Sequence, residues 1–315
     1  MNENFSGNSC KIKDLELIDA SEETALCPCF FLHKLPYLEK LIVSNGVLEE
    51  MFICKGHGCK ERYMAEAPSK LNYLRLARLN DSLNLGEENF LLGKIFQNLT
   101  ILEVSSCNKL RALVSSTVTF QNLTTLEVSK SGGLINLMAI STAKSLVQLA
   151  RLKIIKCQLI EEIIIHGGDR EENPIIFSKL EYLELHCLPR LTSFYIGSYA
   201  IEFPSLQQIV VRQCPNMKFF SHGALSMPSL HKLQTKEVEE GFLEGSLNTT
   251  TQKMFKDMVC TFFTLLLLSH LFCVVFSISF FPNRPICLIQ QKKYCSPVLS
   301  QKKLFSNLTE IFSIV

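Results

Sequence analysis

Apolar residues recur along this chain with a spacing that changes inside each repeating unit. In the two clearest units, which start at Leu99 and Leu123, leucine or valine returns at relative positions 3, 5, 11 and 14. Residues two positions apart share one face of a strand but not one face of a helix. Each unit is therefore predicted to form a short strand with positions 3 and 5 pointing inward, followed by a corner at positions 8 to 14.

These two units also repeat their sequence. Residues 96–105 and 120–129 are offset by 24 residues and agree at nine of ten positions, differing only at Ile101 and Thr125. A fixed period of this size with an L-x-x-L-x-V core is the signature of a leucine-rich repeat.

The same spacing can be followed through most of the chain at intervals of 24 to 33 residues. The units start at Ile12, Leu38, Leu71, Leu99, Leu123, Leu149, Leu180, Leu206 and Leu230. No single unit can bury its apolar face alone, so the units must stack on their neighbours. The predicted fold is an α/β leucine-rich repeat solenoid of about eight to nine irregular units. It would be a curved horseshoe with a parallel sheet on its concave face.

The pattern divides the chain into four parts. Residues 1–236 are predicted to form the repeat array, 237–257 a C-terminal cap, 258–281 a hydrophobic segment and 282–315 a disordered tail. Two long spacers inside the array, Phe52 to Pro68 and Glu161 to Pro174, contain glycine and many charges. Both are predicted to be surface loops.

The hydrophobic segment 258–281 contains no Asp, Glu, Lys or Arg. As a helix it would be about 36 Å long, enough to cross a hydrocarbon core of about 30 Å. The basic residues after it outnumber those before it, which would place the repeats outside the cell. That orientation conflicts with the lack of a signal-like apolar run in Met1 to Ala20. Two interpretations stay open: a membrane-spanning helix, or a non-homologous extension from a gene-model or splicing artefact.

The composition adds little to this picture. A formal net charge of +2 over 315 residues provides no bulk electrostatic reason to expect a nucleic-acid partner. Thirteen cysteines are scattered without a regular framework. Because no secretory signal is expected, the protein is predicted to be cytoplasmic with reduced thiols, or membrane-anchored through 258–281.

Zinc binding is one alternative for a cysteine-containing loop. Cys54, His57 and Cys59 lie close together, with Cys27 and Cys29 upstream. Structural zinc sites usually combine two clean ligand pairs, and the second pair is missing here. We therefore expect an exposed loop with reduced thiols, no metal site and no cofactor.

Catalysis is not expected either. Cys107, Cys157 and Cys214 share relative position 8, where a small semi-polar residue would pack at the corner. No histidine or acid pair has an evident nucleophile beside it, so no residue meets the mutual-reach criteria of an active site. The chain is predicted not to be an enzyme.

Longer motifs carry a family resemblance. Residues 180–194 read L-x-Y-L-x-L-x-x-L-P-x-L-x-S-F, and residues 203–217 read F-P-S-L-x-x-I-x-V-x-x-C-P-N-M. Over about residues 10–258, the chain resembles the C-terminal leucine-rich repeats of plant coiled-coil nucleotide-binding disease resistance proteins. The resemblance implies recognition of a pathogen effector or a guarded host protein, and restraint of a nucleotide-binding switch domain. The phosphate loop G-x-x-x-x-G-K-[ST] is missing from the sequence, so the chain looks like a repeat-only fragment.

The outward residues of the predicted sheet are the candidate partner-binding surface. The candidates are Tyr73, Arg75, Glu103, Glu127, Arg151, Lys153, Tyr182, Glu184, His186 and Arg212. Strand stacking about 5 Å apart would place Glu103 and Glu127 side by side, next to the basic residues Arg151 and Lys153. Tyr73 and Tyr182 would be anchors. The alternative is an ordinary solvated face.

Three functions follow from these patterns. The first is a non-catalytic protein-recognition module in plant defence, which binds its partner through the concave face. The second is a membrane-anchored leucine-rich repeat receptor-like protein that uses 258–281 as its span. The third is a non-functional truncated product of a resistance gene.

Overall fold

A computed structural model describes residues 11–18, 35–45, 70–79, 95–114, 116–165, 173–235 and 240–241. All of them belong to one compact unit, Met1–Phe262. The predicted spacer from Phe52 to Pro68, most of the predicted cap, the hydrophobic segment and the tail lie outside these ranges.

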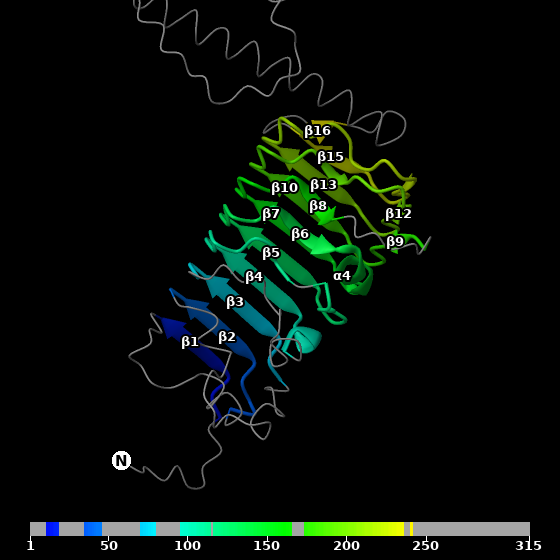
Figure 1. The fold of residues 1–315 in the computed structure, drawn as a ribbon. Coiled ribbons are helices and arrows are strands. Elements are labelled where there is room, and N and C mark those ends of the chain that lie inside the picture. The colour runs from blue at the N-terminus through cyan, green and yellow to red at the C-terminus, as the bar shows by residue number, and fades with distance from the viewer. Residues whose placement is uncertain are drawn as a thin grey trace, which may run out of the picture. The chain divides into compact units, whose positions relative to one another are not determined.

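The main sheet has ten strands that follow one another in chain order (Figure 1). They are β1 (Asp14–Ile18), β2 (Lys40–Ser44), β3 (Tyr73–Ala77), β4 (Ile101–Ser105), β5 (Thr125–Ser129), β7 (Arg151–Ile155), β10 (Tyr182–His186), β13 (Gln208–Arg212), β15 (Lys232–Gln234) and β16 (Glu240–Gly241). The first nine are parallel, and each comes from one of the nine predicted units. The predicted leucine-rich repeat solenoid is confirmed.

The register of the main sheet places equal relative positions opposite one another. Leu102 of β4 is opposite Leu126 of β5, which is opposite Leu152 of β7, and all three side chains are fully buried. Position 5 forms a second buried row that includes Val104 and Val128. Because side chains alternate across a strand, positions 2, 4 and 6 point to the opposite face.

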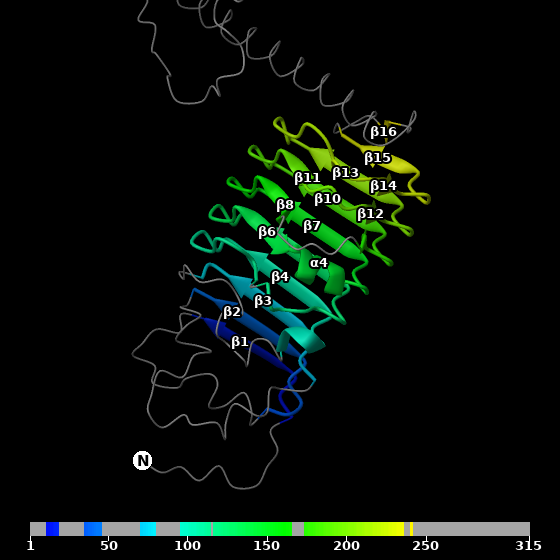
Figure 2. The ribbon, with the colours of Figure 1, turned by 45° about the vertical axis from the view of Figure 1, so that its right-hand side comes forward.

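Short strands also line the other side of the solenoid (Figure 2). One three-stranded sheet consists of β6 (Asn136–Ala139), β8 (Glu162–Ile165) and β11 (Ser193–Tyr195), and another of β9 (Ile175–Ile176), β12 (Ile201–Glu202) and β14 (Leu225–Ser226). The helix α4 (Ile140–Ser145) follows β6, and residues 95–98 form a single helical turn. The α component of the described residues is therefore small.

The prediction of a loop from Glu161 to Pro174 was wrong for residues 162–165. Strand β8 occupies these residues, and Ile163 and Ile164 are fully buried. β8 pairs in parallel with β6 and β11, which explains why this segment is ordered in the solenoid. Residues 166–172 lie outside the described ranges.

Two other predicted segments are described only in part or not at all. Of the predicted cap 237–257, Glu240–Gly241 forms β16, which pairs antiparallel with β15 and so interrupts the parallel array. No helix among the described residues is long and apolar enough to cross a membrane, and the segment 258–281 is not among them.

A backbone feature recurs at relative position 7, directly after the main strands. Seven residues there have φ between 52° and 58°: Asn45, Arg78, Ser106, Lys130, Lys156, Cys187 and Gln213. None of them is glycine, although side chains rarely adopt this left-handed conformation. In the first six, the N–H donates to the carbonyl oxygen at position 6 of the next unit, at 2.8–3.0 Å. The left-handed residue thus extends the sheet ladder by one bond and turns the chain away from the sheet.

Candidate partner-binding surface

The structure places all ten candidate residues on the outward face of the main sheet, on strands β3, β4, β5, β7, β10 and β13. Arg75 and Arg151 are exposed and the other eight are partly exposed. All ten occupy relative positions 2, 4 or 6, so their rows are set by the register of the sheet. We call this surface the sheet face.

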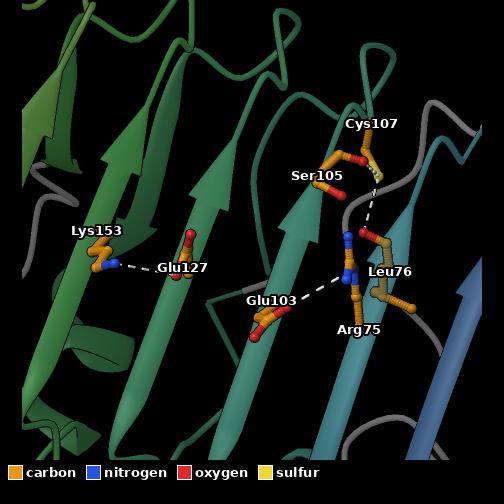
Figure 3. Close-up of polar contacts among 7 residues, drawn as sticks. All are labelled: Arg75, Leu76, Glu103, Ser105, Cys107, Glu127 and Lys153. Carbon is orange, nitrogen blue, oxygen red and sulfur yellow. Dashed lines mark hydrogen bonds and ion pairs between the residues drawn. The ribbon is translucent and has the colours of Figure 1, made fainter.

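A row of charges follows position 4 across the sheet face. Arg75, Glu103, Glu127, Lys153 and Glu184 lie opposite one another in that order. The predicted neighbours Glu103 and Glu127 are adjacent, and each has a cation on its far side (Figure 3). Arg75 Nε is 3.9 Å from Glu103 Oε2, and Lys153 Nζ is 3.7 Å from Glu127 Oε2. Ion pairs at the surface contribute little to stability. Here the two pairs set the sequence of positive and negative charges along the row.

Arg151 does not belong to this row. It occupies position 2, two residues before Lys153, and the register places it opposite Thr125 and Tyr182. Its guanidinium carbon lies 4.8 Å from the centre of the Tyr182 ring, a cation–π contact. The expected strip of two basic residues beside the glutamates is therefore split between two rows.

Tyr182 is held at both ends. Arg151 covers its ring, and its hydroxyl donates to Glu184 Oε2 at 2.8 Å. The pKa of Tyr182 is raised to about 12. Burial is the larger cause, and the hydrogen bond to Glu184 is the second. The phenol therefore stays protonated and able to donate at physiological pH.

Tyr73 has the same arrangement at the other end of the sheet face. Lys40 Nζ lies 5.0 Å from the centre of its ring. The pKa of Tyr73 is also raised to about 12. Burial is again the larger cause, and the hydrogen bond with Glu103 is the second. Each tyrosine is thus fixed by a cation over the ring and a carboxylate at the hydroxyl. The sequence placed Lys40 on the outward face, but its contact with Tyr73 became known only from the register.

Two uncharged residues, Ile101 and Thr125, lie between Tyr73 and Arg151 within the position 2 row. The row runs Tyr73, Ile101, Thr125, Arg151 and Tyr182. Ile101 and Thr125 are partly exposed. They are also the only difference between the two ten-residue copies, so the copies differ only where they face outward.

The cysteines of position 8 are buried at the corner, as the sequence indicated. Cys107, Cys157 and Cys214 are at most 2% exposed. Burial raises the pKa of the Cys157 thiol to about 11 and that of Cys214 to about 12, so both are neutral and poor nucleophiles. Their Sγ atoms contact backbone carbonyl oxygens; that of Cys107 lies 3.5 Å from Ser105 O and 3.9 Å from Leu76 O (Figure 3).

The described part of the chain contains no group of three or more His, Cys, Asp or Glu side chains that could hold a metal ion. The zinc alternative involved Cys27, Cys29, Cys54, His57 and Cys59, all of which lie outside the described residues. That alternative stays a prediction.

Comparison with known protein families identifies the repeats. Residues 2–119 and 118–239 each match the family described as "Plant disease resistance protein RPS2-like, leucine-rich repeats". The chain belongs to this family. The two matched stretches meet just before Phe120, where the second ten-residue copy begins. No curated protein and no solved structure matches the chain.

Membership of the RPS2-like repeat family confirms the resemblance noted in the motifs and indicates a protein-interaction role in defence, with proteins as partners. Leucine-rich repeat solenoids are typically non-catalytic interaction modules, because stacked units create an extended binding surface. In this chain, the stacked strands form the sheet face.

Proposed function

We propose that this chain is a non-catalytic recognition module of plant defence that binds a pathogen effector or a guarded host protein through its sheet face. The observation that carries the proposal is the pair of fixed tyrosines, Tyr73 and Tyr182, on either side of the uncharged residues Ile101 and Thr125. Tyrosine is enriched among the residues that dominate binding energy at interfaces.

The arrangement favours binding in two ways. The tyrosine rings are already held by neighbouring side chains, so a partner would lose less conformational entropy in ordering them. The charged row beside them contains both signs in a defined order, which favours one orientation of the partner more than it adds affinity. An apolar side chain of the partner would contact Ile101 and Thr125, between the Tyr73 ring on one side and Arg151, which covers the Tyr182 ring, on the other.

The test uses the full chain in a binding screen against effectors and host defence proteins. For any partner found, Ile101→Arg and Lys153→Glu should each weaken binding by about tenfold or more, without lowering the melting temperature. Ile176→Arg is the matched control, because Ile176 is 38% exposed on β9 and away from the main sheet. Equal binding by all three variants and the wild type would show that the partner uses another surface.

A cytoplasmic location and a nucleotide-binding switch domain as a second partner belong to the same proposal. The membrane-anchored receptor is the alternative for the compartment. Carbonate extraction of the full chain and of a version ending at Val259 separates the two, because only an anchored chain loses membrane association on truncation. Transcript sequencing across the Val259 codon tests the truncated-product alternative.

A further inference from the structure

We infer that the edge of the solenoid at the carboxyl ends of the main strands binds an extended acidic segment of a protein. Seven exposed basic residues lie in the loops that follow these strands: Arg78, Lys109, Arg111, Lys130, Lys156, Arg190 and Lys218. We call them the basic rim. This surface is separate from the sheet face, and the inference goes beyond the function proposed above.

The two edges of the main sheet differ in charge. The loop residues at relative positions 7 to 12 that follow β4, β5, β7, β10 and β13, together with Arg78 after β3, contain these seven cations and one acid, Glu161. The residues that precede the same strands, 70–72, 97–100, 121–124, 148–150, 179–181 and 205–207, contain only Lys70, Lys179 and Glu181. The whole chain has a net charge of only +2, so positive charge is concentrated at the rim while the other residues of the sequence carry a net negative charge.

The backbone holds the basic rim in rows. Arg78, Lys130 and Lys156 occupy the left-handed position 7, and the Lys130 N–H donates to Ile155 O at 2.8 Å, next to Lys156. The backbone at relative position 12 forms a second ladder of hydrogen bonds, which runs from Arg111 to Lys218. In it, Ile135, Glu161, Thr192 and Lys218 each donate to the previous unit's carbonyl at 2.9–3.0 Å.

Like charges in successive turns repel one another, since neighbouring strands are only about 4.8 Å apart. Lys130 and Lys156 are such neighbours, and neither has an ion-pair partner among the described residues. The single acid of the rim shows how a carboxylate relieves this repulsion. Glu161 Oε1 lies 3.6 Å from Arg190 Nη2 of the next turn. A carboxylate supplied by a partner would act in the same way at Lys130 and Lys156.

The dimensions fit an extended chain. Five strand steps separate β3 from β13 in the sheet, or about 24 Å, which about seven or eight extended residues would span. Ile135 and Leu159 are 39% and 37% exposed among these cations. A segment that combines Glu or Asp with an occasional leucine would therefore suit the rim better than a uniform polyanion.

The test measures fluorescence anisotropy of a labelled peptide of about ten residues, rich in Glu with interspersed Leu, mixed with the full chain. A peptide with Gln in place of Glu is the uncharged control. Lys130→Glu with Lys156→Glu should weaken binding by about tenfold, and Arg111→Glu with Lys218→Glu should do the same at positions with ordinary backbone conformation. Lys70→Glu with Lys179→Glu changes the net charge equally on the opposite edge and should leave binding within about twofold.

The inference is wrong if the opposite-edge variant loses as much affinity as the rim variants, because the attraction would then be non-specific. It is also wrong if phosphatidylserine vesicles or a single-stranded oligonucleotide bind at the rim while the peptide does not. The sheet-face variant Lys153→Glu should keep the peptide bound, so this test and that of the proposed function can fail independently.

Discussion

The pair of repeats most alike in sequence and the pair with the most described contacts between phenyl rings are different parts of this solenoid. Residues 96–105 and 120–129 are nearly identical in sequence. Their described aromatic packing consists of one contact, Phe96 against Phe120, with ring centres 5.5 Å apart. The units that start at Leu180 and Leu206 are less alike, yet four phenyl rings pack together between them.

The difference arises from one relative position. Phenylalanine stands three residues before each unit start in both regions, as Phe96 and Phe120 and as Phe177 and Phe203. Position 14 holds Leu113 and Leu137 in the first region, whereas it holds phenylalanine in the second.

The second region therefore has two stacked pairs. Phe177 and Phe203 are 5.1 Å apart and Phe194 and Phe220 are 4.8 Å apart, with edge-on contacts between the pairs at 5.8–6.3 Å. The similarity of two repeats in sequence therefore does not set their aromatic packing, which depends on the residues that face each other across the coil.

The largest expected effect tests this contrast directly. Phe194→Ala should lower the free energy of unfolding by about 4–5 kcal/mol, because Phe194 is fully buried and contacts three other rings. Phe96→Ala should lower it by about 3 kcal/mol, since one described ring contact is lost. Urea denaturation of the full chain, followed by circular dichroism, measures both. Equal losses would mean that the ring cluster adds nothing beyond burial.

A smaller effect is expected at position 8, which holds Cys107 and Ser131 in the first region and Leu188 and Cys214 in the second. Ser131 Oγ accepts the Cys107 N–H at 3.1 Å, and Ser131 is fully buried. Ser131→Ala would remove the hydrogen bond from Cys107 N–H to Ser131 Oγ and should destabilise by about 1–3 kcal/mol. Ser131→Cys should cost less, because cysteine occupies the same position in three other units, as Cys107, Cys157 and Cys214. Hydrogen exchange at the Cys107 amide is the second readout, and unchanged protection in Ser131→Ala would contradict the bond.

The smallest effect should be the same in both regions. Lys130 and Gln213 have φ of 54° and 53°, so replacing either with valine should destabilise by about 1–2 kcal/mol. Glycine at either position should be neutral or stabilise by up to about 1 kcal/mol. Melting temperatures of the four variants check this. A valine variant as stable as its glycine counterpart would show that the left-handed turn is not maintained in solution.

The pattern of leucines was sufficient to predict the main sheet. The spacing 0, 3, 5 sets which residues a strand can bury, so the strand in each unit and its outward residues followed without coordinates. The same spacing identified position 8 as a buried corner. The second set of strands was missed, because runs such as Glu162–Ile165 show no alternation of their own and were assigned to a loop.

The outward residues could be named from the sequence, but their partners could not. Whether Arg151 lies beside Glu127 or over Tyr182 depends on the register between strands that are 26 and 31 residues apart in the chain. The sequence by itself determined which face each side chain would take, since that is a property of the local backbone. Only the tertiary structure decided which side chains meet on that face and at the rim, because stacking brings residues from successive units within contact distance.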